Sequence, residues 1–549
     1  MYIHYNTNQT CLPLEISSVL PQDHIVFTIE KVVNELAEDC FSAFYHDFGR
    51  PSYHPKMLLA ALLFAYSQGI FSGRKIERLM VENLAMHYLT GQLVVSYRTI
   101  NRFRVAKGME DLIQDLFVEF SVRLKIEEFV SLNCLYIDGT KIEANANKYS
   151  FVWKKATDKF SLKLQESIRQ SFQEEIAPLI KEAIILDKEE PISSEQLTEF
   201  VAILEKELEE TNQEIEQKPV KGRDQRKEKR RKIKKAIRKV KDDFLVRAEK
   251  YENYEETFEG RNSFSKTDTD ATFMRMKDDH MMNGQLKPGY NLQIATENQF
   301  VLHYDVFPNS TDITTLLPFL ESYPHELQTI VADAGYGSEE NLVTLNELGV
   351  NHFIKYALFD KEQKRSYKQS SRNLDNWTYD EIQDSYVHPD GWIYHFDCIK
   401  HRQTSTGFTQ EIKVYKADNP DLAPQKGLYL NHRYQELKQI ESQALLSEEG
   451  SRIFAQRKVD VEPVFGQIKA CLGYKRCNLR GKRQVKIDMG LTYYIDVIKR
   501  FFLRAPLKTS CLPSYQKKKR HLPSNFRQES LYFLLFYPYY RENSDFWAH

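Results

Sequence analysis

Apolar positions in the first quarter of the chain recur at the spacing of an α-helix. An almost unbroken apolar run over 56–66 predicts one buried helix. After a glycine-containing break, Ile76, Leu79 and Met80 keep nearly the same period and predict a second helix. We therefore predict a helical N-terminal domain over residues 1–130.

A short basic segment lies near the end of this helical region. Ser96 can cap a helix in which Ile100 and Phe103 face inward. Arg98 and Arg102 of the same helix would then face solvent. A basic helix that follows a helix and a turn is how helix-turn-helix modules reach the DNA major groove. The alternative is an ordinary solvated helix, and the pattern alone leaves both interpretations open.

Beyond residue 130 the pattern changes to short apolar runs typical of strands. Strands are predicted over 134–138, 141–149, 290–296, 300–306, 329–332 and 350–356. A turn at Gly139 would join the first two strands, and a turn at Asn298 and Gln299 would join the next two. An apolar-periodic helix that stops at Gly349 separates the last two strands. Such a β-α-β unit requires part of the sheet to be parallel.

Two stretches interrupt this α/β pattern and differ from it in composition. Over about 154–260 glycine nearly vanishes and Glu, Lys and Gln dominate, which predicts a helical insertion. Ser193 and Gln196 can form a capping box within it. Residues 224–246 carry a dense Lys/Arg coat, which is either a solvated face or a contact for the DNA backbone. Over about 358–450 aromatic residues surround a Pro-Asp-Gly turn, which predicts a β-rich insertion.

Three acidic residues occupy positions suited to a divalent-metal site. Asp138 and Asp333 each follow an apolar strand-like run, and Glu462 lies on a predicted helix. The segment 457–486 holds nine Lys or Arg residues against two acids. Mg²⁺ prefers oxygen ligands and is usually bound by one or two carboxylates together with substrate phosphates. The acids and their basic neighbourhood therefore predict metal chemistry on phosphate.

Each acid also has an ordinary structural interpretation. An Asp-Gly pair can form a turn, Asp333 can cap a helix, and Glu462 can favour a first helical turn. Other candidates are Asp268 and Asp270 in a predicted turn, Asp305 in a strand, Asp312 and Asp460. Thr311 can cap a helix over about 312–321, and we assign Asp312 to a helix cap rather than to the metal site. On a helix, Asp460 would face away from Glu462.

Bulk properties narrow the class of protein. A chain of 549 residues is too long for one compact core. The formal net charge is −1, so charge is sorted into local patches rather than spread as a uniform basic coat. Seven Cys without a repeated spacing and the lack of a signal-peptide pattern predict a cytoplasmic protein. No apolar run reaches the roughly 20 residues needed to cross a membrane. Residues 506–549 are predicted to form a basic and aromatic C-terminal tail.

A second group of residues has the types and spacing of a possible zinc site. His395, Cys398 and His401 are spaced by three, as zinc ligands can be. A fourth ligand is not evident nearby, so the pattern favours an ordinary strand segment over a zinc site.

The residues around the three acids resemble motifs of bacterial insertion-sequence DDE transposases. The resembling segments are 135–141, 331–337, 289–293 and 268–271. Glu462 and Lys469, separated by six residues, are similar to the Glu–Lys half of the family's Tyr-Arg-Glu-Lys signature. The Tyr–Arg half departs from it, because Lys458 stands where Arg is expected, with Arg457 beside it. Ala455 stands at the expected Tyr position.

The resemblance covers roughly residues 15–505 and implies an RNase H-like catalytic domain over 131–505. That domain is an α/β fold with a mixed sheet and flanking helices, here interrupted by the two insertions and preceded by the helical domain. Asp138, Asp333 and Glu462 would hold two Mg²⁺ ions, for which Mn²⁺ can substitute. The implied activity is DNA strand cleavage and strand transfer at the ends of an insertion sequence.

The implied partner is double-stranded DNA, at transposon ends and target, bound by a homodimer. Lys469, Arg457 and Lys458 would contact DNA near the acids, and Arg98 and Arg102 would do so from the N-terminal domain. Two alternatives remain open. One is a related metal-dependent nuclease that cuts without joining. The other is a DNA-binding protein whose catalytic domain is inactive.

Overall fold

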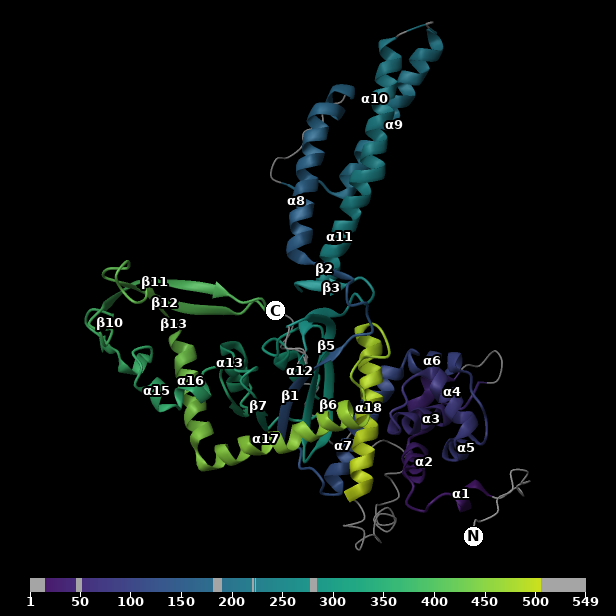
Figure 1. Ribbon diagram of the computed structural model, residues 1–549, viewed down its shortest axis with the longest axis vertical. Helices are drawn as coiled ribbons and strands as arrows, with labels where there is room; N and C mark the ends of the chain where they lie inside the picture. Colours follow the sequence, from purple (N-terminus) through teal and green to yellow (C-terminus); the bar gives the residue numbers. More distant parts are fainter. Residues whose placement is uncertain are drawn as a thin grey trace, which may run out of the picture. The chain divides into compact units, whose positions relative to one another are not determined.

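The computed structural model describes residues 15–45, 52–180, 190–219, 222, 224–276 and 284–504. The predicted tail over 506–549 lies outside this part of the chain. The first described region is helical, as predicted, and is coloured purple to blue in Figure 1. Its helices are α1 (Ile16–Val19), α2 (Ile25–Glu35), α3 (Pro55–Ser67), α4 (Gly73–Glu82), α5 (Leu84–Thr90), α6 (Tyr97–Arg104) and α7 (Met109–Ile126), with a 3₁₀ turn η1 (Glu38–Phe44).

The central element of this region is α3, which is buried around most of its circumference. A helix that is apolar on all sides needs other helices around it, and α2, α4 and α5 pack against it. Pro55 stands in its first turn, where a missing N–H costs nothing. The basic helix α6 is capped by Ser96, whose hydroxyl accepts from the Arg98 backbone N–H. That cap agrees with the prediction.

A six-stranded mixed sheet forms the core of the next region (Figure 1). Its strands are β1 (Cys134–Glu143), β4 (Thr272–Arg275), β5 (Leu286–Glu297), β6 (Phe300–Phe307), β7 (Thr329–Ala332) and β8 (Asn351–Ile354). The order is β4-β5-β1-β7-β8, and β6 also pairs with β5. The pairs β1–β7 and β7–β8 are parallel, and the others are antiparallel. The predicted parallel β-α-β unit is confirmed, with α13 (Glu339–Glu347) as its helix.

The predicted turn at Gly139 is wrong. β1 runs without a break through Gly139 to Glu143, because eight of its residues pair in antiparallel register with β5. There is accordingly no separate strand over 141–149. The predicted helix over 312–321 begins later than expected, since α12 spans Leu316–Glu321.

The helical insertion is confirmed. It contains α8 (Lys154–Ser171), α9 (Ser194–Gln217), α10 (Gln225–Lys239) and α11 (Val246–Phe258), with single π-helical stretches η2 (Phe172–Ile176) and η4 (Val240–Leu245) and a 3₁₀ turn η3 (Ala177–Leu179). A small sheet of β2 (Phe151–Trp153) and β3 (Ser263–Ser265) joins its two ends. The predicted capping box at the start of α9 is present in full. The helices share their own apolar core, including Leu204, Ile233 and Val240.

The β-rich insertion is a five-stranded antiparallel sheet in the order β13-β12-β11-β10-β9. Its strands are β9 (Thr378–Asp380), β10 (Ser385–Val387), β11 (Ile393–Gln403), β12 (Thr409–Ala417) and β13 (Gly427–Leu430), preceded by α14 (Phe359–Glu362), α15 (Arg365–Lys368) and η5 (Leu374–Asn376). The chain continues through α16 (His432–Leu446), α17 (Glu448–Gly466), the π-helical η6 (Gln467–Cys471) and α18 (Lys482–Arg504). None of the described helices combines the length and apolar character needed to cross a membrane.

Candidate active site

Asp138 lies on β1, and Asp333 directly follows the neighbouring strand β7 at the same level of the sheet. Tyr136 of β1 is opposite Val331 of β7 in parallel register. Asp138 and Asp333 each follow these partners by two residues, so they come level with one another. Asp138 Oδ1 accepts from the N–H of Gly139, and Asp333 Oδ1 accepts from the N–H of Gly335, both at 2.8 Å. The parallel pairing therefore brings together two acids that are 195 residues apart in sequence.

A third carboxylate, Asp312, lies beside these two. A Cβ added to Gly139 would lie 2.8 Å from Asp312 Oδ1, and one added to Gly335 would lie 3.3 Å from Asp312 Oδ2. The Asp312 side chain is held by two amides of β5, Asn291 Nδ2 at 2.7 Å and Gln293 Nε2 at 2.8 Å. Assignment of Asp312 to a helix cap was therefore wrong. Its side chain bonds across the sheet, because α12 starts four residues later.

Tyr336 lies close enough to these acids to feel their charge. Its ring is fully buried, and its hydroxyl donates to Gln293 Oε1. Burial raises the pKa of the Tyr336 phenol well above its ordinary value, and the charges of Asp312, Asp138 and Asp333 raise it further. Tyr336 therefore stays protonated and remains a hydrogen-bond donor. Gln293 bonds both Tyr336 and Asp312, which fixes its amide orientation and in turn the position of Asp312.

Helix α17 supplies a cation to this group. Arg457 Nη1 lies 3.1 Å from Asp138 Oδ2, and both side chains are mostly buried, at 12% and 14% exposed. The guanidinium also lies over the Phe454 ring, 5.7 Å from its centroid. Lys458, by contrast, is exposed. Of the two cations that the sequence left as alternatives, Arg457 is the one that reaches the acids.

The remaining residues of α17 face in different directions. Asp460 is buried and accepts from the backbone N–H of Gln299 at 3.0 Å, and burial raises its pKa. Glu462 is exposed, so the two acids point apart, as expected from helical geometry. Within the part of the chain that the structure describes, no hydrogen bond or ion pair joins Glu462 to the aspartates. Lys469, on η6, donates to Thr140 Oγ1 at 2.7 Å and to the Lys141 carbonyl at 3.2 Å.

Comparison with known families decides the identity. Residues 14–106 match the Transposase domain (DUF772), and residues 261–494 match the Transposase DDE domain. The chain belongs to the insertion-sequence DDE transposases. It is therefore a DNA-binding enzyme of a family that generally depends on divalent metal. No curated protein matches the chain.

The strand that carries Asp138 lies outside both matches, because the DDE match begins at residue 261. The helical insertion explains this gap in the transposase. It separates β1 from the rest of the sheet in sequence, although β1 pairs with both β5 and β7. The sheet, rather than the linear sequence, shows that Asp138 belongs with Asp333.

Other acidic candidates have structural partners in the transposase. Asp268 Oδ1 accepts from Tyr290 Oη at 2.8 Å and from the Gly481 N–H at 3.1 Å. Asp270 Oδ2 accepts from the Lys482 N–H at 2.8 Å. These two aspartates therefore hold the start of α18, where a helix leaves backbone donors free. Asp305 is likewise paired, with Lys486 at 3.1 Å. In the zinc-like cluster, His395 is paired with Asp418 at 3.0 Å.

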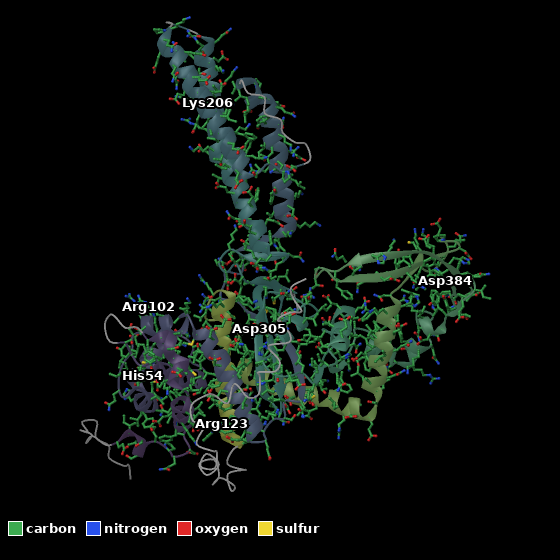
Figure 2. All side chains as sticks on the ribbon, turned by 180° about the vertical axis from the view of Figure 1, so that it is seen from behind. His54, Arg102, Arg123, Lys206, Asp305 and Asp384 are labelled. Atoms are coloured by element: carbon green, nitrogen blue, oxygen red, sulfur yellow. The ribbon has the colours of Figure 1, made fainter. Side chains whose placement is uncertain are left out.

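The predicted DNA-contact residues of α6 lie at the surface. Arg98 and Arg102 are exposed, while Ile100 and Phe103 are buried, as the periodicity predicted. Figure 2 labels Arg102 at the edge of the helical region. Arg104, at the end of the same helix, is buried instead and contacts Asp488.

The donor set around Asp138 is compatible with a hard divalent cation. Carboxylate and amide oxygens are what Mg²⁺ prefers, and it commonly keeps waters and substrate phosphates as further ligands. The buried Asn291 Oδ1 has no hydrogen-bond partner among the described residues, so it adds an uncommitted oxygen beside Asp312. In the same part of the chain, no three His, Cys, Asp or Glu side chains are close enough to hold an ion by themselves. The protein would therefore supply some of the ligands and DNA the others.

Proposed function

We propose that this transposase cuts DNA at the ends of its insertion sequence and joins those ends to a target, using Mg²⁺. The observation that carries the proposal is the grouping of Asp138 on β1 with Asp312 and Asp333, which follow β6 and β7, around the buried Tyr336. Carboxylates placed close together and partly shielded from water repel one another unless a cation lies among them. Arg457 provides one positive charge, and a divalent metal ion would provide more.

In this proposal Asp138, Asp333 and Glu462 hold two Mg²⁺ ions. Bound Mg²⁺ would activate the attacking oxygen and stabilise the leaving oxygen of a phosphodiester. The amides of Asn291 and Gln293 fix the Asp312 carboxylate beside Asp138, so Asp312 keeps the local charge negative and attracts the cations. Arg457 orients Asp138 through their ion pair.

Double-stranded DNA is the proposed partner, as transposon ends and as target. Lys458 is exposed one position after Arg457, and we propose that it contacts a DNA phosphate. Arg98 and Arg102 would contact DNA from α6. We further propose a homodimer on DNA, because two transposon ends must be held together for joining.

The experiment is a cleavage and joining assay on the DNA that flanks the gene, with Mg²⁺ and with mapping of every cut and join. Asp138→Asn, Asp333→Asn and Glu462→Gln should each abolish cleavage by at least about 100-fold while DNA binding persists. Asp375→Asn, at an exposed site on the β-rich insertion, is the matched control and should cleave normally. Normal cleavage by one of the three variants would remove that residue from the proposed site.

The same assay separates the alternatives. Cuts without joined products would identify a metal-dependent nuclease rather than a complete transposase. Binding without any cut by the unaltered protein would identify a DNA-binding protein with an inactive catalytic domain.

A further inference from the structure

The helix α10 carries far more positive charge than the fold uses. Ten of its fifteen residues are Lys or Arg, and one is acidic. Its inward face is apolar, since Ile233 and Ala236 are buried in the core of the helical insertion. The teal helices of Figure 1 include α10, and Lys206 in Figure 2 marks the neighbouring α9.

Some cations of this insertion are committed to ion pairs that stabilise it. The pairs are Arg226 with Asp224 at 2.8 Å, Lys229 with Glu207 at 3.1 Å, Lys232 with Glu228 at 3.3 Å, Lys239 with Glu175 at 3.0 Å and Lys241 with Glu205 at 3.7 Å. They hold α10 and η4 to α9 and η2, or brace α10 itself. These cations are therefore explained by the fold.

Four others are not explained in this way. Arg231, Lys234, Lys235 and Arg238 are all exposed. Their spacing of three, four and seven residues places them on one face of the helix. None has an ion pair or a side-chain hydrogen bond among the residues that the structure describes. We call these four residues the basic stripe; at 1.5 Å per residue it is about 10 Å long.

The basic stripe opposes helix formation rather than helping it. Like charges three and four residues apart repel one another, whereas alternating Glu and Lys would attract. Acids are available nearby on α9, and the fold pairs them with other cations. A solvated surface has no need of four unpaired cations in one row, so the row fits a polyanion outside the insertion.

We propose that the basic stripe binds the phosphate backbone of double-stranded DNA at a site separate from the acids. Double-stranded DNA carries one charge per roughly 1.7 Å of its axis, so a row of about 10 Å meets several phosphates. Lys and Arg contacts to phosphate fix position without reading sequence. The basic stripe therefore adds affinity for any duplex, and the inference rests on the proposed function only in taking DNA as the substrate.

The test compares two variants of the full-length protein. In Arg231→Gln/Lys234→Gln/Lys235→Gln/Arg238→Gln the charge is removed. In Arg231→Lys/Lys234→Arg/Lys235→Arg/Arg238→Lys it is kept at the same positions. Binding to a 30-base-pair duplex of unrelated sequence is measured by fluorescence anisotropy over a series of salt concentrations. Circular dichroism checks that both variants keep their helical content.

The charge-removed variant should bind more weakly, and its slope of log affinity against log salt should fall by about 0.9 for each phosphate that the stripe no longer neutralises. The charge-kept variant should retain the slope of the unaltered protein. An unchanged slope in a helical, charge-removed variant would overturn the proposal. So would charge-dependent binding to phosphatidylserine vesicles in place of duplex DNA, since that would identify a membrane surface as the partner.

The failure of this inference is distinguishable from failure of the proposed function. If the unaltered protein cuts its flanking DNA and the slope is unchanged in the charge-removed variant, only the basic stripe is refuted. If the unaltered protein binds DNA with a slope that depends on the basic stripe but makes no cut, the inference stands without the proposed activity.

Discussion

Replacement of Asp488 by Asn should destabilise the protein more than any surface substitution. Asp488, near the start of α18, is fully buried together with Arg104 of α6, at 0% and 3% exposed. Its two carboxylate oxygens accept from the hydroxyls of Tyr66 and Tyr474. Arg104 Nη1 lies 3.7 Å from Asp488 and also donates to Tyr66 Oη at 2.9 Å. This network joins the basic helix of the N-terminal region to the catalytic region.

The magnitude follows from what Asn leaves behind. Burial raises the pKa of Asp488, and the Arg104 guanidinium and the two tyrosine hydroxyls oppose that rise. Without the carboxylate, Arg104 remains buried with no opposite charge, and its Nε already has no partner among the described residues. Breaking a buried ion pair from one side costs about 3–5 kcal/mol. Tyr474→Phe removes only one bond to the charged group and should cost about 1.5–3 kcal/mol.

Both variants are measured by urea unfolding followed by circular dichroism. A chain of this size need not unfold in one step, so the midpoint of the first transition is the quantity compared. Glu436→Gln, at an exposed site on α16, is the control and should change the free energy of unfolding by less than about 0.5 kcal/mol. An Asp488→Asn midpoint equal to that of Glu436→Gln would refute the reasoning. It would mean that Arg104 is satisfied without Asp488.

Two further predictions concern pH and the candidate site. Burial lowers the pKa of His303 from 6.5 to about 4. As the pH falls from 6.5 to 4, the unfolded chain takes up a proton that the folded chain does not. The free energy of unfolding therefore falls by about 3 kcal/mol over this range. His303→Gln should flatten this part of the acid dependence of urea midpoints, and an equally steep profile would contradict it. Gly139→Ala would place a methyl group 2.5 Å from Gln293 Nε2 and 2.8 Å from Asp312 Oδ1, so cleavage should fall by about 10-fold or more. Gly466→Ala, with no neighbour within 4 Å, is its control, and equal activity of the two variants would show that the site tolerates the displacement.

Features set by neighbouring residues could be predicted from the sequence. The capping box of Ser193 and Gln196 is present because both partners lie within one helical turn. The turn at Asn298 and Gln299 forms where both residues adopt positive φ, 53° and 67°. Asn tolerates that conformation better than most residues, so the local signal was sufficient there.

Features set by distant pairing could not be predicted in the same way. An Asp-Gly pair commonly marks a turn, but Asp138 and Gly139 continue a strand, because β5 offers a full ladder of backbone partners. Asp312 follows a turn-like Asn-Ser-Thr sequence, but its carboxylate is bound by two amides of β5 about 20 residues earlier. In both cases the residue that decides the outcome lies on another strand.

Which of Arg457 and Lys458 contacts the aspartates depends on the face of α17 that each residue occupies, which a sequence motif does not give. In sequence the two cations are adjacent, and spacing from Glu462 favoured Lys458. On α17, Arg457 shares a face with Val461 and Val464, which are both fully buried. That face packs on β1 and β7, the strands that carry or precede the aspartates. Only a side chain on this face can reach Asp138, so packing of the helix on the sheet, and not the count of residues to Glu462, selects Arg457.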